Sequence, residues 1–284
     1  MNSELITEKR SVNYPSLFVR KYKKKVFYKN LWGEDPLLLE SRGHIVNESG
    51  SLVVNPLTKI FNYQENNTTI PMDESVLVVE KINGFMASVT YVPELGKAIV
   101  STTGSLDSEY VDLATEMLPY AIEFIEKHKK EITYVFEIVH PDDTHIIKEN
   151  IGAYLVARRE VCDKTPYFTN YSSEQILDKL AKMMRVSRPN YYRSTFFKVV
   201  NISKTCRHEG FVVYGKTTVL KIKSPYYLAL KAYARRKDIL SLDKTKVDEE
   251  YYELVEHLTT NKEQFLSLKE QERLEYMKNF LHRS

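Results

Sequence analysis

Cysteine is scarce in this sequence, which contains only two among 284 residues. Cys162 and Cys206 lie far apart and neither forms a CxxC pair, which argues against a disulfide framework and against a zinc site. The seven histidines are scattered and show no HExxH spacing. This pattern is typical of a reducing compartment, and we expect a cytoplasmic protein, of the host cell if the chain is viral.

Long apolar runs are also missing. No stretch approaches the ~18 apolar residues that a bilayer-spanning helix needs. The N-terminus lacks the apolar core of a signal peptide. We therefore expect no membrane segment and no leader.

Neither sign of charge is in large excess, with 41 Lys and Arg against 38 Asp and Glu and a net charge of +3. So small a net charge does not by itself indicate a nucleic-acid partner. Two basic clusters, residues 20–25 and the group Lys231, Arg235, Arg236 and Lys237, could each be a solvated face or a surface that contacts phosphates. With 43% apolar residues, the chain suits one large domain, alone or with a small appendage.

Hydrophobic periodicity predicts both strands and helices. We expect strands at residues 16–20, 25–28, 41–46, 51–55, 76–80, 85–92, 97–101, 132–139, 153–157, 209–214 and 217–222. We expect helices at residues 109–130, 173–186, 225–237, 247–258 and 262–281. The apolar stripe of the first helix predicts core packing through Leu113, Met117, Tyr120 and Phe124.

One lysine, Lys81, stands between the valine-rich stretch 76–80 and the apolar run that begins at Phe85. This pattern favours a lysine at a strand–turn–strand junction. Partial desolvation there would lower the pKa of its amine and make it a nucleophile. The alternative is an exposed lysine in a turn, because Asn83-Gly84 is a strong hairpin signal.

Four further charged residues fall inside predicted strands or at their ends: Glu137, Glu209, Lys221 and Lys223. A charge buried in a strand is costly unless it is paired or meets a ligand. Lys221 and Lys223 share one face of their strand, because side chains repeat every two residues. Each could instead face solvent on a half-exposed strand.

In this order the charged residues resemble the covalent nucleotidyltransferases, which comprise ATP-dependent ligases and GTP-dependent capping enzymes. The matching motifs are KxxG at residues 81–84, a strand glutamate at 136–138, an EGxV-like element at 209–212 and KxK at 221–223. Three further segments, at 42–43, 56–62 and 154–158, resemble the RNA ligase 1 family of bacteriophages. The likeness covers about residues 40 to 230.

The resemblance implies an α+β fold. An antiparallel-sheet nucleotidyltransferase domain, of the ATP-grasp-like ligase type, would occupy residues 1–228, and a small all-helical domain would occupy 229–284. The helical periodicity after residue 225 favours an RNA ligase, because capping enzymes and most DNA ligases carry an OB-fold there.

The resemblance also implies the chemistry. Lys81 would attack the α-phosphate of ATP, expel pyrophosphate and form a lysyl–AMP phosphoramidate. Glu209 would hold Mg²⁺ or Mn²⁺, because hard cations prefer oxygen ligands. The other nucleotide contacts would be Lys221 and Lys223 at the α-phosphate, Lys59 at the β- and γ-phosphates, Arg42 and Glu137 at the ribose, Leu155 and Val212 around adenine, and Glu80 beside the nucleophile.

Two positions depart from the family pattern. Asn83 stands where an aspartate is usual, and an amide can neither act as a base nor bring charge to a metal. Thr103 stands where a lysine often precedes Gly-Ser, which puts one phosphate contact in doubt.

The expected partner is RNA, since AMP would pass to a 5′-phosphate and a 3′-hydroxyl would then displace it. Broken tRNA is one candidate substrate, and we expect a monomer. A DNA ligase and an mRNA guanylyltransferase are alternative enzymes. A nucleic-acid-binding module with coincidental motifs is the non-enzyme alternative.

Overall fold

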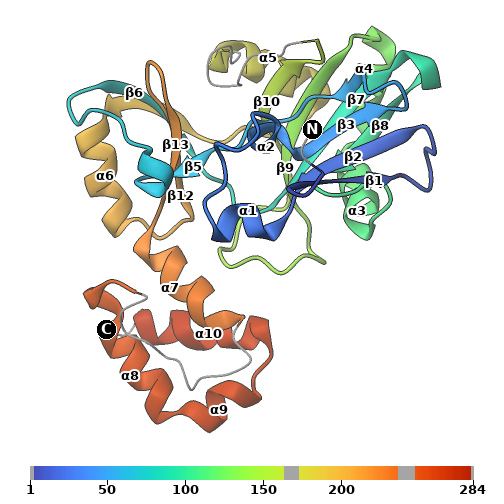
Figure 1. Ribbon diagram of the computed structural model, residues 1–284. Helices are drawn as coiled ribbons and strands as arrows, with labels where there is room; N and C mark the ends of the chain where they lie inside the picture. Colours follow the sequence, from blue (N-terminus) through green and yellow to red (C-terminus); the bar gives the residue numbers. More distant parts are fainter. Residues whose placement is uncertain (1–2, 163–172, 236–246, 283–284) are drawn as a thin grey trace.

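The computed structural model describes residues 3–162, 173–235 and 247–282 (Figure 1). It contains a mixed body of sheets and helices and, after it, a lobe of helices at the C-terminal end. The strands form three sheets in which nearly all neighbours run antiparallel. Among the described helices, none combines the length and apolar character needed to cross a membrane.

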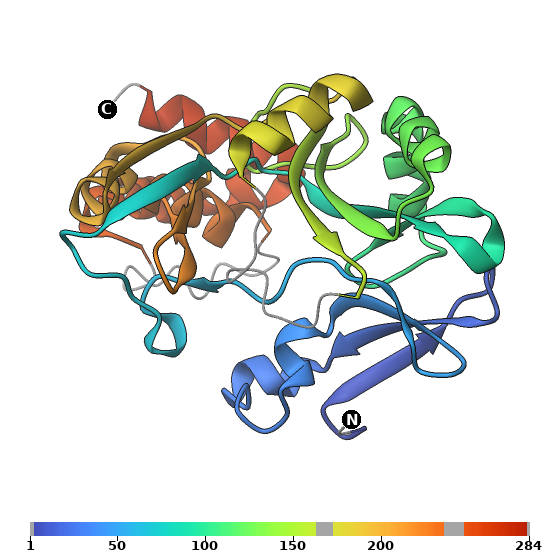
Figure 2. The same cartoon turned by 90° about the horizontal axis from the view of Figure 1, so that it is seen from above.

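The N-terminal sheet has the order β1-β2-β3-β4 and packs beside the central sheet, away from the helical lobe (Figure 2). Its strands are β1 (Ile6–Arg10), β2 (Leu17–Tyr22), β3 (Arg42–Asn47) and β4 (Leu52–Val54). Two short helices, α1 (Lys24–Tyr28) and α2 (Leu37–Glu40), separate β2 from β3. The predicted strand at 25–28 is therefore wrong. β2 already pairs with β1 and β3 on its two sides, so residues 25–28 could not return beside it as a hairpin strand.

The central sheet has the order β10-β9-β7-β8. Its strands are β7 (Phe85–Val92), β8 (Lys97–Thr102), β9 (Ile132–Val139) and β10 (Gly152–Glu160). Three helices share a core with this sheet: α3 (Glu109–Met117), α4 (Pro119–His128) and α5 (Glu174–Met184).

The single helix predicted at 109–130 is two helices. Pro119 has no N–H and restricts the residue before it, so Leu118 leaves the helical conformation between α3 and α4. The buried stripe is also displaced by one residue from the predicted one, and Tyr120 is 48% exposed. The buried residues of the pair are Ala114, Leu118, Ala121 and Ile125.

The third sheet has the order β11-β6-β12-β13-β5, and only β5 and β13 run parallel. Its strands are β5 (Phe61–Asn62), β6 (Ser75–Glu80), β11 (Tyr191–Thr195), β12 (Gly210–Tyr214) and β13 (Val219–Lys223). Helix α6 (Phe196–Thr205) shares a core with it. A second cluster, with Val79 from β6 and Val135 from β9, joins this sheet to the central one. Residues 81–84 therefore connect strands of two different sheets.

The helical lobe consists of α7 (Pro225–Ala234), α8 (Tyr252–Thr260), α9 (Lys262–Ser267) and α10 (Glu270–Leu281). As predicted, α7 begins at Ser224-Pro225, where the Ser224 hydroxyl accepts a hydrogen bond from the Tyr227 N–H at 3.0 Å. The predicted helix at 262–281 is broken at Leu268, which is extended. All four helices share one core, which also takes in Ile146 and Ile147 from the loop after β9.

Candidate active site

Lys81 lies at the junction of two sheets, immediately after β6. Its backbone N–H donates to the carbonyl of Gly210 at 2.9 Å, which extends the pairing of β6 with β12. Its amine lies 3.0 Å from Glu209 Oε2 and 3.8 Å from Glu137 Oε1. The side chain is only 20% exposed, so the amine faces carboxylates from both sheets and not open solvent.

Two glycines allow neighbouring strands to approach closely on either side of Lys81, one within each sheet. A Cβ on Gly84 would lie 2.2 Å from the carbonyl oxygen of Ile138, and one on Gly210 would lie 2.0 Å from that of Ile222. Gly210 also has φ +128°, which L-residues rarely adopt. The glycines of the KxxG and EGxV-like motifs are therefore steric requirements of this junction.

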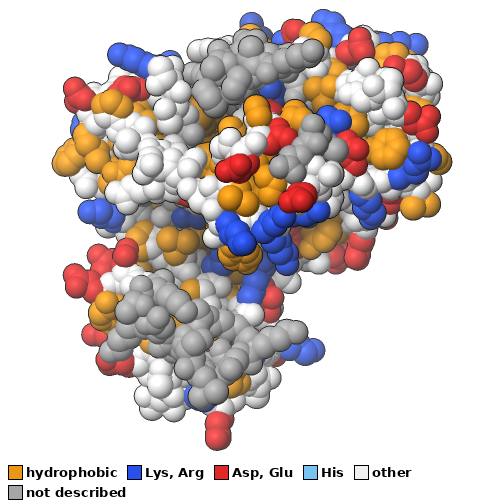
Figure 3. Space-filling view, viewed as in Figure 1, with side chains coloured by type: hydrophobic (Ala, Val, Ile, Leu, Met, Phe, Trp, Pro, Cys, Tyr) orange, Lys and Arg blue, Asp and Glu red, His pale blue; other side chains and the backbone are white. Residues whose placement is uncertain are grey.

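Four more cations face the same region from separate segments. β13 supplies Lys221 and Lys223, and Lys223 pairs with Glu209 at 3.3 Å. The Lys59 amine lies 3.3 Å from Glu65 and 4.7 Å from the centre of the Phe61 ring. Burial first, and then the positive charges of Arg42 and Lys59, lower the pKa of Lys221 to about 6. Figure 3 shows Lys and Arg side chains gathered where the mixed body meets the helical lobe.

Such a set of neighbouring cations would favour a bound anion. Burial, which outweighs the attraction of Glu65, also lowers the pKa of Lys59, and Arg42 adds to the shift. An anion placed among Arg42, Lys59, Lys221 and Lys223 would relieve this repulsion. The geometry is therefore suited to a polyphosphate beside the Lys81 amine.

The predicted low pKa of Lys81 is wrong for this arrangement. Burial alone would lower it, but the carboxylates of Glu137 and Glu209 outweigh burial and raise the pKa of the amine. The two carboxylates respond in opposite ways. Burial raises the pKa of Glu137, whereas at Glu209 burial is overcome by Lys81 and Lys223, which lower the pKa.

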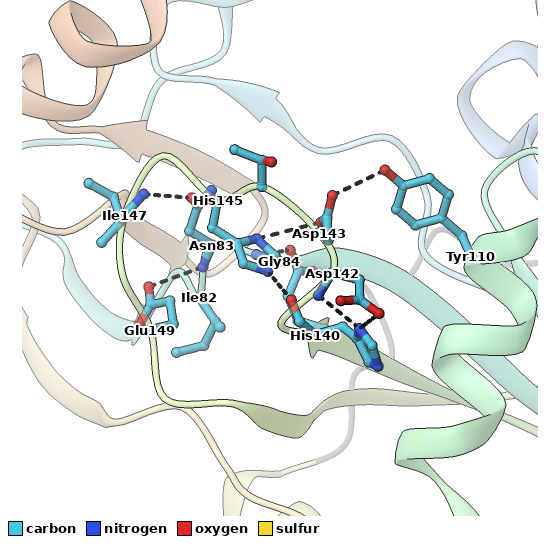
Figure 4. A network of polar contacts seen from close by, with 12 residues as sticks. Ile82, Asn83, Gly84, Tyr110, His140, Asp142, Asp143, His145, Ile147 and Glu149 are labelled. Atoms are coloured by element: carbon cyan, nitrogen blue, oxygen red, sulfur yellow. Dashed lines mark hydrogen bonds and ion pairs between the residues drawn. The ribbon is translucent and has the colours of Figure 1, made fainter. Parts of the chain in front are cut away.

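Asn83 is the hub that fixes the turn after Lys81 (Figure 4). Its Nδ2 donates to Glu209 Oε2 at 2.8 Å, and its Oδ1 accepts from the Ile147 N–H at 2.9 Å. Its own N–H donates to Glu149 Oε1 at 3.1 Å. This residue must therefore donate on one side and accept on the other, which an amide does and a carboxylate does not. Here the departure from aspartate is a structural requirement.

We expect Asn83→Asp to destabilise the protein by about 2–3 kcal/mol, the cost of losing one hydrogen bond to a charged group. Two carboxylates would then face each other where Asn83 and Glu209 now bond. The loss should shrink at acidic pH, where one of the two carboxylates is protonated. Thermal denaturation across pH checks this, with Asn190→Asp, next to the exposed side of Glu80, as a matched control. An equal loss in both variants would contradict the explanation.

The residues predicted to lie around adenine or beside the nucleophile are found in different surroundings. Leu155 is fully buried in the core under the helices, so it cannot line an open pocket, and that assignment is wrong. Val156, the next residue of β10, points to the opposite face and packs in the cluster that contains Val212. The Glu80 carboxylate accepts a hydrogen bond from the Asn190 side chain at 2.9 Å.

Three side chains at the site were not anticipated: Glu65, Glu149 and Tyr227. Glu65 and Glu149 lie in loops whose sequence carries no periodic signal. Tyr227 is the third residue of α7, and its hydroxyl lies beside Asn83. Thr103 is the other position that departs from the family pattern. A Cβ on the next residue, Gly104, would lie 3.2 Å from Lys21 Nζ, so a lysine from β2 occupies the space next to Thr103.

Solved structures with a similar fold include ATP-dependent ligases. An archaeal ATP-dependent RNA ligase in its form 1 has a TM-score of 0.55 and 16% identity, over 80% of this chain and 62% of that one. Form 2 has a TM-score of 0.59 and 15% identity, over 95% and 72% of the two chains. A putative ATP-dependent DNA ligase from Aquifex aeolicus has a TM-score of 0.57 and 13% identity, over 97% and 74%. These likenesses confirm the predicted antiparallel nucleotidyltransferase fold.

The fold does not separate RNA ligases from DNA ligases, because both kinds appear among these structures. No curated protein matches the sequence. The family model described as RNA ligase, of the RNA ligase 1 type, matches residues 40–227, which span every motif discussed above. The protein therefore belongs to the RNA ligase family that its motifs predicted.

Proposed function

We propose that this protein is an ATP-dependent RNA ligase that joins a 5′-phosphate to a 3′-hydroxyl through an AMP carried on Lys81. The observation that carries the proposal is the Lys81 amine, held 3.0 Å from Glu209 beside a cluster of four cations, Arg42, Lys59, Lys221 and Lys223. A nucleophile beside a polyphosphate site is the arrangement that nucleotidyl transfer requires.

In the first step, Lys81 Nζ attacks the α-phosphorus of ATP. The P–N bond forms, the bond to the β-phosphate oxygen breaks, and pyrophosphate leaves. Lys221 and Lys223 are placed to neutralise charge on the α-phosphate, and Lys59 and Arg42 to contact the remaining phosphates, as we expected for the first three. Arg42 therefore takes a phosphate as well as the ribose in our proposal, because its charge acts on Lys59 and Lys221.

A divalent cation fits this site only together with the nucleotide. Within residues 3–162, 173–235 and 247–282, no group of three or more His, Cys, Asp or Glu side chains could hold a metal. Mg²⁺ is commonly held by one or two carboxylates plus substrate phosphates, and Glu209 and Glu137 can supply those carboxylates. When bound there, Mg²⁺ or Mn²⁺ would draw negative charge away from the Lys81 ammonium and favour its deprotonation.

The lowered pKa of Lys221 predicts that protons are taken up when ATP binds. With its pKa near 6, it is mostly neutral at about pH 8, and phosphate oxygens would raise that pKa. ATP binding should therefore take up close to one proton at about pH 8, and the uptake should vanish as the pH falls below about 5. Calorimetry without divalent metal, in buffers of different ionisation enthalpy, measures the uptake. Lys221→Met should abolish it, and unchanged uptake in that variant would assign the proton elsewhere.

In the second step, an oxygen of the RNA 5′-phosphate attacks the AMP phosphorus, and the P–N bond to Lys81 breaks as the amine takes a proton. In the third, the 3′-hydroxyl attacks the RNA phosphate and AMP leaves.

Repair of broken tRNA is one use of this activity. We also propose a monomer in the reducing cytoplasm, with residues 1–228 as the adenylyltransferase domain and 229–284 as the helical domain. Two free cysteines and a separate helical core support this description.

The test uses ATP labelled at the α- or γ-phosphate, with Mg²⁺ and denaturing electrophoresis. We expect covalent label from α-labelled ATP alone, none from GTP, and joining of 5′-phosphorylated RNA in preference to nicked DNA. Adduct formation with GTP would favour a guanylyltransferase, and preferential sealing of nicked DNA would favour a DNA ligase. Absence of any adduct would leave the nucleic-acid-binding alternative.

A further inference from the structure

A cavity of about 320 Å³ lies beside the turn that carries Lys81. Its walls come from four parts of the chain: residues 83–85, Tyr110 of α3, the loop after β9, and α7 with its C-terminal end in the helical lobe. Apart from Asn83, the proposed adenylation step uses none of its lining side chains. The cavity lies at the lower end of the range for small-molecule sites, which suits a single nucleotide.

One end of the cavity is cationic. Lys231 and Arg235 both project from α7 or its end, one helical turn apart. Arg235 is held in place, because its Nε lies 2.8 Å from Glu270 Oε1 and its guanidinium donates to the carbonyl of Thr144. Lys231 differs, since no carboxylate of the described residues forms an ion pair with it. Its amine lies 5.5 Å from the centre of the Tyr227 ring.

Lys231 lies outside the proposed adenylation site but within electrostatic reach of it. Partial desolvation, followed by the positive charge of Lys223, lowers the pKa of Lys231 although its side chain is exposed. Lys223 lies over the same Tyr227 ring, 5.0 Å from its centre, and pairs with Glu209. A second anion would therefore be favoured at Lys231, next to the site where AMP is bound.

The cavity also has a preformed aromatic and polar wall (Figure 4). The Tyr110 ring packs edge-on against Phe85, with ring centres 4.8 Å apart, and remains partly exposed. Its hydroxyl donates to Asp143 Oδ1 at 3.1 Å, and the other oxygen of Asp143 lies 3.5 Å from His145 Nδ1. An exposed aromatic face with fixed hydrogen-bonding groups can stack a base and hold a ribose.

We propose that this cavity binds the terminal nucleotide of an RNA strand, with its phosphate against Lys231 and Arg235 and its base against Tyr110. The inference rests on the proposed function and adds a substrate site to it. The triphosphate of ATP does not need these cations, because Arg42, Lys59, Lys221 and Lys223 already surround its site. Asn83 lines the cavity and bonds to Glu209, so the strand end would lie next to the adenylated amine.

The test separates the three chemical steps in Lys231→Met, with Lys231→Arg as the conservative variant and Lys127→Met, on the distant α4, as the matched control. Enzyme–AMP formation should stay within about twofold of wild type, because it needs no RNA. The KM for RNA should rise about tenfold in Lys231→Met, as expected for one lost charge-assisted contact, and recover in Lys231→Arg. Binding of a short 5′-phosphorylated RNA should also lose about one unit of salt slope.

The step that Lys231→Met impairs identifies which end of the RNA strand occupies the cavity. A loss in AMP transfer to 5′-phosphorylated RNA would place the donor end in the cavity. A loss confined to the sealing of pre-adenylated RNA would place the 3′-hydroxyl end there. Unchanged RNA steps and unchanged RNA binding would overturn the inference, as would an equal loss in enzyme–AMP formation. A wild-type protein without any adduct would contradict the proposed function instead, and the binding measurement would still decide the cavity.

Discussion

Lys81→Ala is expected to carry no covalent AMP, down to the detection limit, when incubated with α-labelled ATP and Mg²⁺. The reason is chemical, since the bond to phosphorus is made by the Lys81 amine and another lysine would have to reach the same point. Lys223 and Lys221 lie on β13, with Lys223 paired to Glu209, so neither is placed between Glu209 and Glu137 as Lys81 is.

The same substitution should retain one activity. Sealing of RNA that already carries AMP needs the pocket but not the amine, because the P–N bond is never formed. We expect Lys81→Ala to seal pre-adenylated RNA while failing to form the adduct, and to lose about 1.5–3 kcal/mol of stability with its contact to Glu209. Lys148→Ala, an exposed lysine of the nearby loop, is the control. Label on the Lys81 variant would remove Lys81 from its role.

The charged residues of the site could be singled out because they fall inside predicted strands or at their ends, and the resemblance to nucleotidyltransferases supplied their expected roles. The two-residue repeat put Lys221 and Lys223 on one face of their strand, and Glu209 stood at the mouth of the same hairpin. The tight approach at Gly84 and Gly210 is consistent with these motifs, although its steric cause becomes visible only when the opposing carbonyls are known.

Other features depend on tertiary contacts that no local pattern carries. Val156 and not Leu155 packs with Val212, because the two neighbours point to opposite faces of β10 and only the packing of the sheets decides which face meets Val212. The pKa of Lys81 was predicted with the wrong sign because desolvation can be expected from sequence, whereas the distances to Glu137 and Glu209 cannot. In the same way, the role of Asn83 depends on a loop sixty residues further along the chain.

The second large effect is expected for Glu209→Gln. Glu209 is 3% exposed and contacts Lys81, Lys223 and Asn83, so its charge compensates two largely buried ammonium groups. Removing it should cost about 3 kcal/mol of stability at neutral pH, towards the low end for a broken buried ion pair because both lysines keep some contact with water. Enzyme–AMP formation should fall by about 10²–10³-fold, since the amine is no longer positioned.

The pH dependence of that stability loss follows from the direction of the pKa shift. The pKa of Glu209 is held below its ordinary value of 4.5 by Lys81 and Lys223, against the effect of burial. Its contribution is therefore complete above 4.5 and is lost as the pH falls through the lower, folded-state value. Urea denaturation from about pH 7 to about pH 3 should show the free energies of unfolding of wild type and Glu209→Gln converging only at the acid end.

Glu149→Gln is the matched control, because burial raises the pKa of Glu149, and its substitution should not destabilise the protein at neutral pH. A Glu209→Gln deficit that stays constant down to the acid end would show that the carboxylate does not act through its charge.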